Sequence, residues 1–427
     1  MKIAIIGSGI SGLTCGHYLH AKHDVTIFES NDYIGGHTAT IDIEHEGEKH
    51  AVDTGFIVYN DRTYPNFIEM LERIGVKGKP TEMSFSVRND ATGLEYNGHT
   101  VTTLFAQKSN WFNPKFYHFI WEILRFNKLA KRYVDSVKGC DLTLGDFLAE
   151  QNFSDYFCDN YILPMGAAIW SSTLADMRAF PLYFFLRFFL NHGLLDITNR
   201  PQWYVVEGGS RAYIDPLTEG FKERILLKCS VTSVKRDVTG VSILANGQSY
   251  RFDQVIFACH SDQALKMLEE PTREEYSVLG NMAYQSNEVV LHTDTSLLPK
   301  ASSAWASWNY LIEGKDNQQF ASPSLTYNMN ILQHIKSDHT FCVSLNSSDH
   351  IQQNKVIRTF NYYHPVFNSA AIQAQSRKSE ISGQNNTWFC GAYWRNGFHE
   401  DGVKSALDVV EGISERVEVL ARQEAAS

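Results

Sequence analysis

The chain of 427 residues has few of the features that mark nucleic-acid-binding, disulfide-linked or membrane-spanning proteins. Its formal net charge is −10, and binding to a phosphate backbone needs a basic surface, so we expect no nucleic-acid partner. Its seven cysteines are dispersed without a C-x-x-C pair, which predicts reduced thiols in a cytoplasmic protein and no metal site. No run of about 18 apolar residues is present that could span a membrane.

What is present is the composition of a folded protein with many aromatic side chains. Hydrophobic residues make up 43% of the chain and charged residues 20%, and the length favours two domains. The 26 Phe, 20 Tyr and 8 Trp indicate large apolar pockets or an apolar surface. The apolar start KIAIIGSGISGL is short and runs into helix-forming sequence without a cleavage site. We therefore interpret it as a first strand and not as a signal peptide.

Three glycines follow this first predicted strand. IAIIG is an apolar, β-branched run typical of a buried strand, LTCGHYLHAK is helix-forming, and VTIFES is a second strand. Gly7, Gly9 and Gly12 have the G-x-G-x-x-G spacing at the strand-to-helix turn. Gly7 permits a tight turn, Gly9 lets the backbone approach a pyrophosphate, and Gly12 lets helix and strand pack closely.

Glu29 ends the second predicted strand, at a position where a carboxylate accepts both hydroxyls of a ribose. A 2′-phosphate would be repelled there, so the pattern predicts an adenosine without one. The free N–H groups and the positive dipole end of the helix would face the pyrophosphate. Together these features predict a dinucleotide site in a βαβ unit. A glycine-rich turn without a ligand is the less favoured alternative.

A second set of motifs follows this strand. NDYIGGHTAT contains Gly35, Gly36 and His37, and AVDTGFIVYN contains Asp53 and Gly55. With these motifs, the sequence resembles the FAD-dependent family of flavin amine oxidases, phytoene desaturases and protoporphyrinogen oxidases. That family has the same glycine fingerprint and acid, then G-G followed usually by Arg, then D-x-G. His37 stands where Arg is usual, which is a departure at one phosphate contact.

The C-terminal segment TWFCGAYWRNGFHEDGVKSALDVVEGI is typical of a strand, a loop and a helix, and it also fits the family. The resemblance implies that this segment closes the FAD site, with the helix N-terminus stabilising the reduced flavin at its N1/O2 edge. The cofactor-binding residues that the resemblance implies are Gly7, Gly9, Ile10, Ser11, Gly12, Glu29, Ser30, Gly35, Gly36, His37, Thr38, Gly55, Phe56, Ile57, Val231, Gly391, Ala392, Glu400, Gly402 and Val403.

A middle segment of alternating strands, ILLKCSVTSVKRDVTGVSILANGQSYRFDQVIFACH, resembles the meander that this family inserts in its FAD domain, with Val231 at the adenine. We therefore predict an α/β fold with a Rossmann-like FAD-binding domain of the GR2 type, formed by residues 1–60, 205–275 and 385–427. An interleaved α+β substrate domain would comprise residues 61–204 and 276–384.

Two helical segments of the predicted substrate domain are strongly apolar. In the helix predicted over 115–132, polar side chains at 115, 118, 122, 125 and 132 lie opposite Phe116, Phe119, Ile120 and Ile123. For this helix we favour packing on the core, with contact to a membrane surface or an anionic amphiphile as the alternative. PLYFFLRFFLNHG is apolar almost all round and is predicted to be buried; in the alternative it walls a tunnel in which Arg187 meets a carboxylate.

The residues that handle amines in this family are changed. Flavin amine oxidases usually have a Lys at the start of a substrate-domain strand, and QSNEVVLHTD offers Asn287 there. The two tyrosines that flank the flavin of monoamine oxidases correspond to Phe398 and to Tyr362 or Tyr363. No Cys is placed for a thioether, so we expect non-covalent FAD, with a link through His364 as the alternative.

These departures favour a hydrophobic substrate over an amine. We predict an FAD-dependent oxidoreductase in which flavin N5 takes a hydride from a fatty-acyl or isoprenoid chain, in a desaturation, an oxidation or an isomerisation. The alternatives are an amine or amino-acid oxidase and a non-catalytic flavin-binding partner protein. The catalytic candidates are His399, which could move a proton, and Asn287.

The remaining candidates concern the substrate and the location of the protein. For contact with the substrate we name Arg187, Tyr393, Trp394 and Phe398. Tyr393 and Trp394 could wall the flavin or cap the core, and Cys259 and His260 are predicted to pack near the cofactor. We expect a cytoplasmic protein, with membrane association through the helix over 115–132 left open.

Overall fold

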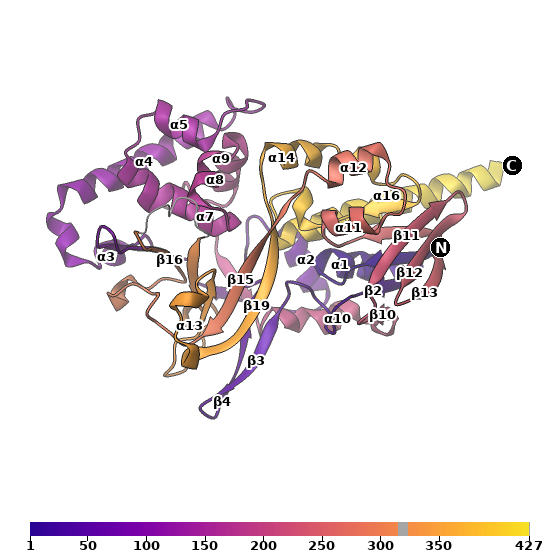
Figure 1. Cartoon of the computed structure of the whole chain (residues 1–427), viewed down its shortest axis with the longest axis horizontal. Coiled ribbons are helices and arrows are strands. Elements are labelled where there is room, and N and C mark those ends of the chain that lie inside the picture. Colours follow the sequence, from indigo (N-terminus) through magenta and orange to yellow (C-terminus); the bar gives the residue numbers. More distant parts are fainter. Residues whose placement is uncertain (315–322, 427) are drawn as a thin grey trace.

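The computed structural model describes residues 1–314 and 323–426, and a parallel five-stranded sheet lies at the centre of one half of the molecule (Figure 1). Its strand order is β10-β2-β1-β14-β20, with β1 (Lys2–Ile6), β2 (Asp24–Phe28), β10 (Ile225–Leu226), β14 (Gln254–Phe257) and β20 (Thr387–Phe389). The helix α1 (Ile10–Leu19) joins β1 to β2, which confirms the predicted βαβ unit. Glu29, predicted to end the second strand, directly follows the last residue of β2.

Alternate side chains of β1 enter two different cores, because successive residues of a strand point to opposite faces. Ile3 and Ile5 pack with α1 and with α16 (His399–Ala426), whereas Ala4 and Ile6 pack against an antiparallel meander. The meander comprises β11 (Val231–Asp237), β12 (Gly240–Ala245) and β13 (Gln248–Phe252). The sheet is therefore covered on both faces, which explains why its strands are continuous apolar runs.

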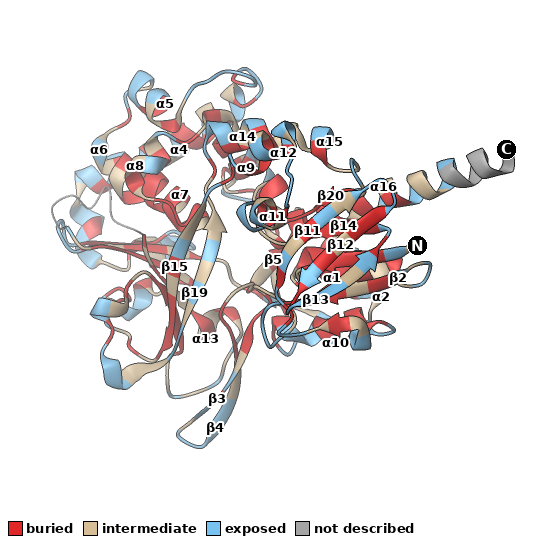
Figure 2. Ribbon diagram, turned by 45° about the vertical axis from the view of Figure 1, so that its right-hand side comes forward, coloured by how far each residue is buried: buried red, intermediate tan, exposed pale blue. Residues whose placement is uncertain are grey.

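Six further helices surround these layers. They are α2 (Pro65–Arg73), α10 (Ile214–Thr218), α11 (Ser261–Met267), α12 (Arg273–Leu279), α14 (Ser369–Ser376) and α15 (Lys378–Ile381). In Figure 2 the buried residues gather in the parallel sheet and α1, while the far end of α16 projects from the body of the molecule.

The other half of the molecule is built on a seven-stranded sheet of order β19-β15-β18-β17-β16-β7-β8. Its strands are β7 (Phe85–Asn89), β8 (Leu94–Asn97), β15 (Tyr284–His292), β16 (Trp308–Ile312), β17 (Ser324–Asn328), β18 (Cys342–Leu345) and β19 (Val356–Pro365). The strand predicted at QSNEVVLHTD is thus confirmed as β15. The described part of this sheet draws on segments that lie more than 200 residues apart in the sequence.

A group of helices between β8 and β9 packs on one face of this sheet (Figure 1). These are α3 (Val101–Leu104), α4 (Pro114–Tyr133), α5 (Leu144–Glu150), α6 (Asp155–Phe157), α7 (Leu163–Trp170), α8 (Leu174–Arg178) and α9 (Leu182–Asn191). Their core is rich in phenylalanine, including the fully buried Phe116, Phe119 and Phe126 of α4. The aromatic content of the sequence is therefore concentrated here.

Short strands link the two halves. The hairpin of β3 (Thr40–His45) and β4 (Glu48–Asp53) lies against α13 (Met329–Leu332), and β9 (Trp203–Val206) pairs with both β5 (Val58–Asn60) and β6 (Gly78–Thr81). The assignment of residue ranges to two domains remains a prediction. No helix among the described residues is both long and apolar enough to cross a bilayer.

The polar face predicted for the helix over 115–132 was wrong at Glu122. Its side chain is buried, and its carboxylate accepts hydrogen bonds from the amide (2.7 Å) and the hydroxyl (2.5 Å) of Ser154. The segment before α6 covers this side of α4, and that long-range contact has no periodic signal in the sequence. Tyr117 and Trp121, by contrast, are about half exposed.

Candidate functional site

The glycine turn, residues 7–12, is held by backbone contacts that leave no room for side chains at two of its three glycines. The amide of Gly7 donates to the carbonyl of Phe28 over 2.8 Å, and a Cβ at Gly7 would lie 2.7 Å from the oxygen of Ala258. A Cβ at Gly12 would lie 2.0 Å from the oxygen of Gly7. At Gly9, in contrast, a Cβ would meet no atom within 4 Å.

The open space at Gly9 is at the start of α1. Gly9 is the N-cap of this helix, and no side chain caps it. Free N–H groups at a helix start favour a negatively charged group, and the missing side chain lets such a group come close. The turn therefore fits the pyrophosphate of a dinucleotide, as its spacing predicted.

Glu29 lies beside this turn with a nearly buried carboxylate. Oε2 accepts from the amide of Ser8 over 2.9 Å and from its hydroxyl over 2.6 Å, while Oε1 accepts from the amide of Asn31 over 2.8 Å. The amide of Cys229 donates to the Glu29 carbonyl, which brings Val231 at the start of β11 close to the same corner. Glu29, Ser30 and Val231, predicted for the adenosine end, are thus neighbours.

The Gly35–Gly36 loop lies directly against the glycine turn. The amide of Gly35 donates to the carbonyl of Ser8 over 3.1 Å, and a Cβ at Gly36 would lie 3.2 Å from the Cα of Gly9. Gly36 has a φ of 59°, a conformation that glycine adopts without strain. The two glycine motifs therefore form one backbone surface, to which residues 55–57 add the hydrogen bond from Phe56 N to His37 O.

His37 is half-buried and electrically neutral. Burial lowers its pKa to about 3, and the nearby His364 and His260 lower it further. Its Nε2 has no hydrogen-bond partner among the described residues, and its ring lies beside those of Tyr362 and His364. An orphaned buried nitrogen fits a site that a ligand completes. His37 does not supply the positive charge that Arg gives the family at this position.

The two ends of the chain meet at this site, as the sequence predicted. The hydroxyl of Ser11 in α1 donates to the carbonyl of Gly402 in α16 over 3.0 Å. A Cβ at Gly402 would lie 2.8 Å from Cγ2 of Ile10, so this glycine lets the two helix starts pack together. Gly391, Ala392 and Val403 lie in the same corner, since β20 pairs with β14 and Val403 is buried in the core of α1.

Glu400 and His399 are engaged by protein groups. The Glu400 carboxylate accepts from the amides of Asn66 (3.2 Å) and Phe67 (2.9 Å), so its side chain caps α2. His399 stacks on Phe56 with ring centroids 3.7 Å apart, and its Nε2 lies 2.7 Å from the hydroxyl of Tyr213. Burial lowers the pKa of His399 to about 3, so at neutral pH it is not a proton donor in its charged form.

The predicted loop position of His399 was wrong, because it is the first residue of α16. Thr38 belongs to the same hydrogen-bonded group: its hydroxyl contacts the Tyr213 hydroxyl and lies 3.3 Å from Nε2 of His399. These polar atoms satisfy one another in the core between the Gly35–Gly36 loop and α16. The arrangement fixes how the loop meets the helix start.

Asn287 lies in a buried polar cluster that sequence reasoning only partly identified. Its Nδ2 is 3.3 Å from Nδ1 of His364, which in turn is 2.9 Å from the hydroxyl of Ser171. The amide nitrogen of Asn346 donates to Oδ1 of Asn287 over 2.9 Å. Burial lowers the pKa of His364 to about 4. The alternation of NYYHPVF along β19, which places Tyr362 and His364 on one face, was the available signal for this cluster.

Tyr393 and Trp394 cap the core and do not stand free. Both are nearly buried among the meander and α14, and the backbone oxygen of Tyr393 accepts from the side chain of Gln375 over 2.7 Å. The Tyr393 hydroxyl and the Trp394 indole nitrogen have no partner among the described residues. Cys259 and His260 pack nearby, His260 with its ring stacked on Tyr284 at 4.2 Å.

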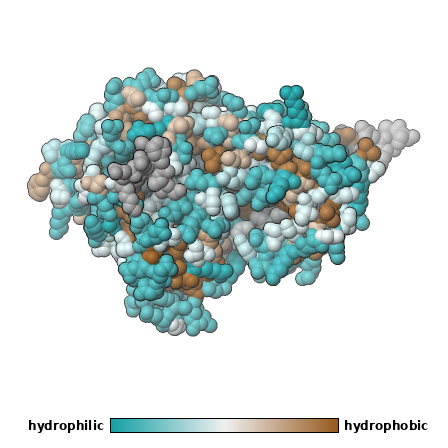
Figure 3. All heavy atoms as spheres, viewed as in Figure 1, coloured by the Kyte–Doolittle hydropathy of each residue, from teal (hydrophilic) through white to brown (hydrophobic). Residues whose placement is uncertain are grey.

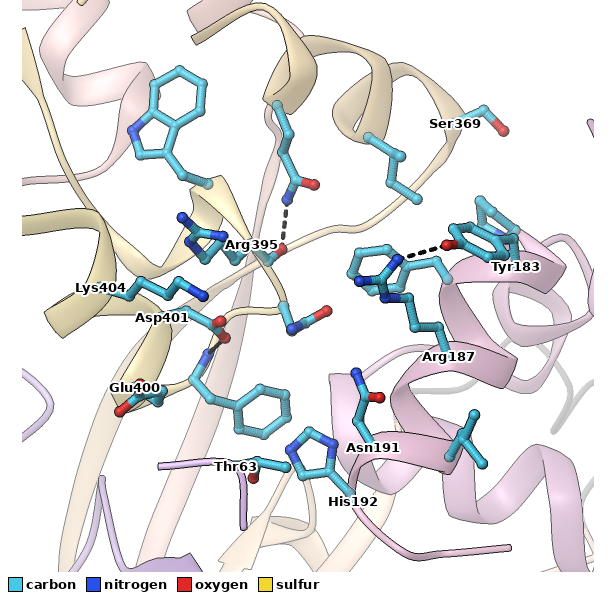
Figure 4. Close-up of a pocket in the computed structure, with 18 of the residues that line it drawn as sticks. Thr63, Tyr183, Arg187, Asn191, His192, Ser369, Arg395, Glu400, Asp401 and Lys404 are labelled. Atoms are coloured by element: carbon cyan, nitrogen blue, oxygen red, sulfur yellow. Dashed lines mark hydrogen bonds between the residues drawn. The ribbon is translucent and has the colours of Figure 1, made fainter. Parts of the chain in front are cut away.

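A cavity of about 970 Å³ opens between α9 on one side and α14 and the start of α16 on the other (Figure 4). Arg187 extends from α9, and Arg395 and Lys404 come from the opposite wall. Its apolar walls include Phe184, Leu190, Ile372 and Phe398. We call this space the cationic cavity. Arg187 was predicted within a buried helix, but its side chain is exposed and donates to the Tyr183 hydroxyl over 2.6 Å.

The inner end of the cationic cavity is closed by aromatic rings. Phe398 stacks on Phe188 with centroids 5.1 Å apart, and Phe188 stacks on His192 at 3.8 Å. Phe398 directly precedes His399, the first residue of α16, so this aromatic contact lies where the cavity wall meets the start of that helix. The predicted substrate residues Arg187, Trp394 and Phe398 all line the cavity, whereas Tyr393 does not.

Comparison with known proteins gives a family match and several similar structures. The sequence model described as flavin containing amine oxidoreductase matches residues 10–328. Putrescine oxidase bound to putrescine has a TM-score of 0.70 at 13% identity, covering 97% of this chain and 99% of that one. Cyclohexylamine oxidase from Brevibacterium oxydans IH-35A has a TM-score of 0.70 at 15% identity, covering 98% and 99%.

A third similar structure is the CLA-producing fatty acid isomerase from P. acnes, with a TM-score of 0.68 at 16% identity, covering 96% of this chain and 97% of that one. No curated protein matches the sequence. These identities establish the fold alone, whereas the family match covers most of the chain. Together with the joined glycine turn and C-terminal helix, it leads to one conclusion: the chain belongs to the flavin-containing amine oxidoreductase family.

Proposed function

We propose that this enzyme binds FAD non-covalently and oxidises or isomerises a hydrophobic substrate that carries an anionic head group, a fatty-acyl or isoprenoid compound being the favoured class. The observation that carries the substrate proposal is the cationic cavity. Its basic side chains surround apolar walls, so it is suited to an amphiphile with a negative end. Lipid metabolism in the cytoplasm is the setting that this proposal implies.

The residues around the glycine turn fit FAD. The free start of α1 and the open space at Gly9 would accept the pyrophosphate, and Glu29 would turn to the ribose hydroxyls. The orphaned Nε2 of His37 would gain a partner from the cofactor. A bound flavin supplies an acceptor for two electrons.

Non-covalent binding follows from the state of the cysteines and of His364. A thiol forms a thioether as its thiolate. Burial raises the pKa of Cys259 and Cys342, and the contact with Cys390 together with burial raises the pKa of Cys15. His364 is held by Ser171 and Asn287. These groups are therefore placed as packing and hydrogen-bonding residues.

The charges of the cationic cavity favour an anion over an amine. Of its three acidic residues, Asp141, Glu400 and Asp401, two are already engaged: Glu400 by amides of α2 and Asp401 by the Phe398 amide over 2.9 Å. Burial raises the pKa of Asp401 to about 6. Lys404 has no carboxylate within ion-pair distance among the described residues, and a substrate carboxylate or phosphate would supply one.

The chain's own residues would bind the substrate and exclude water. Arg187 and Lys404 would hold the head group from opposite walls, and the apolar walls would direct the chain towards Phe398. The stacked pair Phe188 and Phe398 must part for the substrate to pass. Neutral His37, His364 and Asn287 would orient the reacting part by hydrogen bonds.

An amine or amino-acid oxidase is the second candidate, because two of the similar structures are oxidases of putrescine and cyclohexylamine. In this chain no lysine lies on β15, where Asn287 is buried, and Phe398 replaces a tyrosine. A third candidate is a flavin-binding protein that assists a partner enzyme without turnover.

The test is anaerobic reduction of the purified yellow protein. We expect oleate or a polyunsaturated phospholipid to bleach the flavin absorbance, and the matching fatty alcohol to do so only at higher concentration. Bleaching by spermine or tyramine and not by acyl compounds would select the amine oxidase. Absence of bleaching by either set, with retained flavin and no shifted double bond in the recovered acyl compound, would select the non-catalytic role, because an isomerase returns the hydride to its substrate. A colourless protein that refuses FAD would overturn the proposal.

A further inference from the structure

The outer face of α4 and the turn before it form an exposed aromatic surface. Phe112 is 91% exposed, Trp121 53%, Trp111 49% and Tyr117 46%. In Figure 3, brown and tan spheres gather at the end of the molecule where the turn before α4 lies in Figure 1. Large aromatic side chains exposed together in this way mark an interaction site.

The spacing along α4 divides this face into an apolar and a cationic half. Tyr117, Trp121 and Leu124 lie on one stripe of the helix, and Lys128 and Arg132 continue the same stripe towards its C-terminus. All five side chains are exposed. The helix is about 30 Å long, so the apolar half and the cationic half each cover about two turns.

The buried stripe on the opposite side of α4 explains why the aromatic stripe stays turned to the solvent. Phe116, Phe119 and Phe126 are fully buried in the phenylalanine-rich core, and the Asn113 side chain caps the helix start. Glu122 is turned inward to Ser154, so its charge does not offset the cations on the outer face. The aromatic stripe therefore cannot turn inward without unpacking the helix.

The surrounding charge is strongly positive, in contrast to the chain as a whole. Residues 108–138 contain seven Lys and Arg against two acidic residues, within a chain of net charge −10. Lys108, Lys128, Arg132 and Lys138 have no carboxylate within ion-pair distance in the part of the chain that the structure describes. Lys131 pairs with Asp196 over 2.6 Å.

We propose that this surface docks on an anionic phospholipid bilayer. The aromatic side chains of Phe112 and Trp121 would enter the headgroup region, where amphipathic rings are stabilised, and Lys128 and Arg132 would meet lipid phosphates. A second copy of the chain is the alternative occupant, and the test below distinguishes it. The proposal does not depend on the substrate or on turnover.

The C-terminal end of the exposed surface of α4 is adjacent in sequence to one wall of the cationic cavity. Residues 139–143, which follow the basic end of α4, line the cavity, and Leu142 there is 38% exposed. A bilayer docked along α4 would therefore lie near one edge of the cavity. An amphiphile could pass from the membrane to the enzyme over a short path.

The test is co-sedimentation of the purified full chain with vesicles of phosphatidylcholine, with or without phosphatidylglycerol. We expect binding to the anionic vesicles only, and weakening of that binding at high salt. Each basic residue near a bilayer contributes roughly a fivefold factor in affinity, so K128E/R132E should weaken binding at least roughly 25-fold. F112S/W121S should also abolish most binding.

Matched controls use exposed residues of the meander side. K235E/K266E makes the same charge change, and V238S/L244S removes exposed apolar groups; both should bind vesicles as the parent does. Equal binding of all variants, or binding to neutral vesicles alone, would overturn the proposal. Size-exclusion chromatography gives a further outcome: if F112S/W121S converts a dimer to a monomer without changing vesicle binding, the surface covers a second copy.

Discussion

The glycine turn and the cationic cavity differ in how their polar groups are satisfied. At the turn, the Glu29 carboxylate accepts four hydrogen bonds from neighbouring residues, and Gly7 and Gly12 leave no space for a Cβ. At the cavity, Lys404 faces open space and Arg187 is held by a single hydroxyl. The difference teaches that the glycine turn is built by backbone contacts, whereas the cavity proposed to bind the substrate is lined by side chains with few partners.

The largest expected effect tests the close packing of the turn. Gly12→Val would force a side chain into the 2.0 Å approach between Gly12 and the carbonyl of Gly7. We expect a loss of at least about 3 kcal/mol in the free energy of unfolding, measured by urea denaturation. Gly98→Ala is the control, since its Cβ would meet nothing closer than 3.9 Å. Equal stability of the two variants would refute the packing argument.

The second prediction separates binding from stability at the same turn. Gly9→Asn keeps a favoured N-cap residue and fills space that is open in the protein alone. We expect the unfolding free energy of the flavin-free protein to change by less than about 0.5 kcal/mol. The affinity for FAD should fall by about 100-fold, or about 2.8 kcal/mol, in a fluorescence titration. Undiminished FAD binding would show that the pyrophosphate lies elsewhere.

The third prediction concerns how stability depends on pH, through the buried His399 that lies between the glycine turn and the cationic cavity. The pKa of His399 is about 3 in the folded protein and near 6.5 in the unfolded chain, so below pH 6.5 only the unfolded chain gains the proton. His399 therefore contributes a loss of stability as pH falls, of about 2 kcal/mol at pH 5. Asp401, with its pKa raised to about 6, contributes the opposite slope between about pH 4 and 6.

The variant His399→Gln isolates this contribution. Urea unfolding at pH 7 and pH 5 should show a smaller loss of stability for the variant than for the parent. His118→Gln, at an exposed position of α4, is the control and should keep the parent's pH dependence. If the two variants behave alike, His399 is not the neutral buried group that its surroundings indicate.

The smallest expected effect lies at the cationic cavity, where solvent screens the charges. Arg187→Gln and Lys404→Gln should each raise KM for an anionic acyl substrate roughly fivefold, about 1 kcal/mol, with little change in kcat. The same variants should leave KM for the matching fatty alcohol unchanged, and Arg187→Lys should restore part of the effect. Lys222→Gln, on a remote surface, is the control. An equal change for acid and alcohol would assign these residues a structural role.

The same contrast explains which features the sequence could predict. Gly7, Gly12 and Gly402 are required by close backbone packing. The positions of these glycines in the sequence therefore predicted the βαβ unit and the contact between the two ends of the chain. Glu400 was predicted to contact the cofactor but caps α2, because that helix start comes from a segment over 330 residues away. No local pattern reveals such a partner.

The charge of the buried histidines also could not be predicted from the sequence. His37 stands where the family has a cation, and only its burial beside Tyr362 and His364 makes it neutral. The cationic cavity draws its lining from residues 62–65 and 139–143, from α9, from α14 and from the segment at the start of α16, so its charge balance depends on several remote segments. Arg187 alone, within an apolar helix, gave a local signal.

The contact between Ser11 and Gly402 has a consequence for biosynthesis. At roughly 5–20 residues per second, the ribosome makes α16 about 20–80 s after the first strand. Until then β14 lacks its partner β20 and the glycine turn lacks its neighbour. Cofactor loading is thus a late event: a nascent chain still missing its last forty residues has the fingerprint of a dinucleotide protein but no finished pocket to hold one.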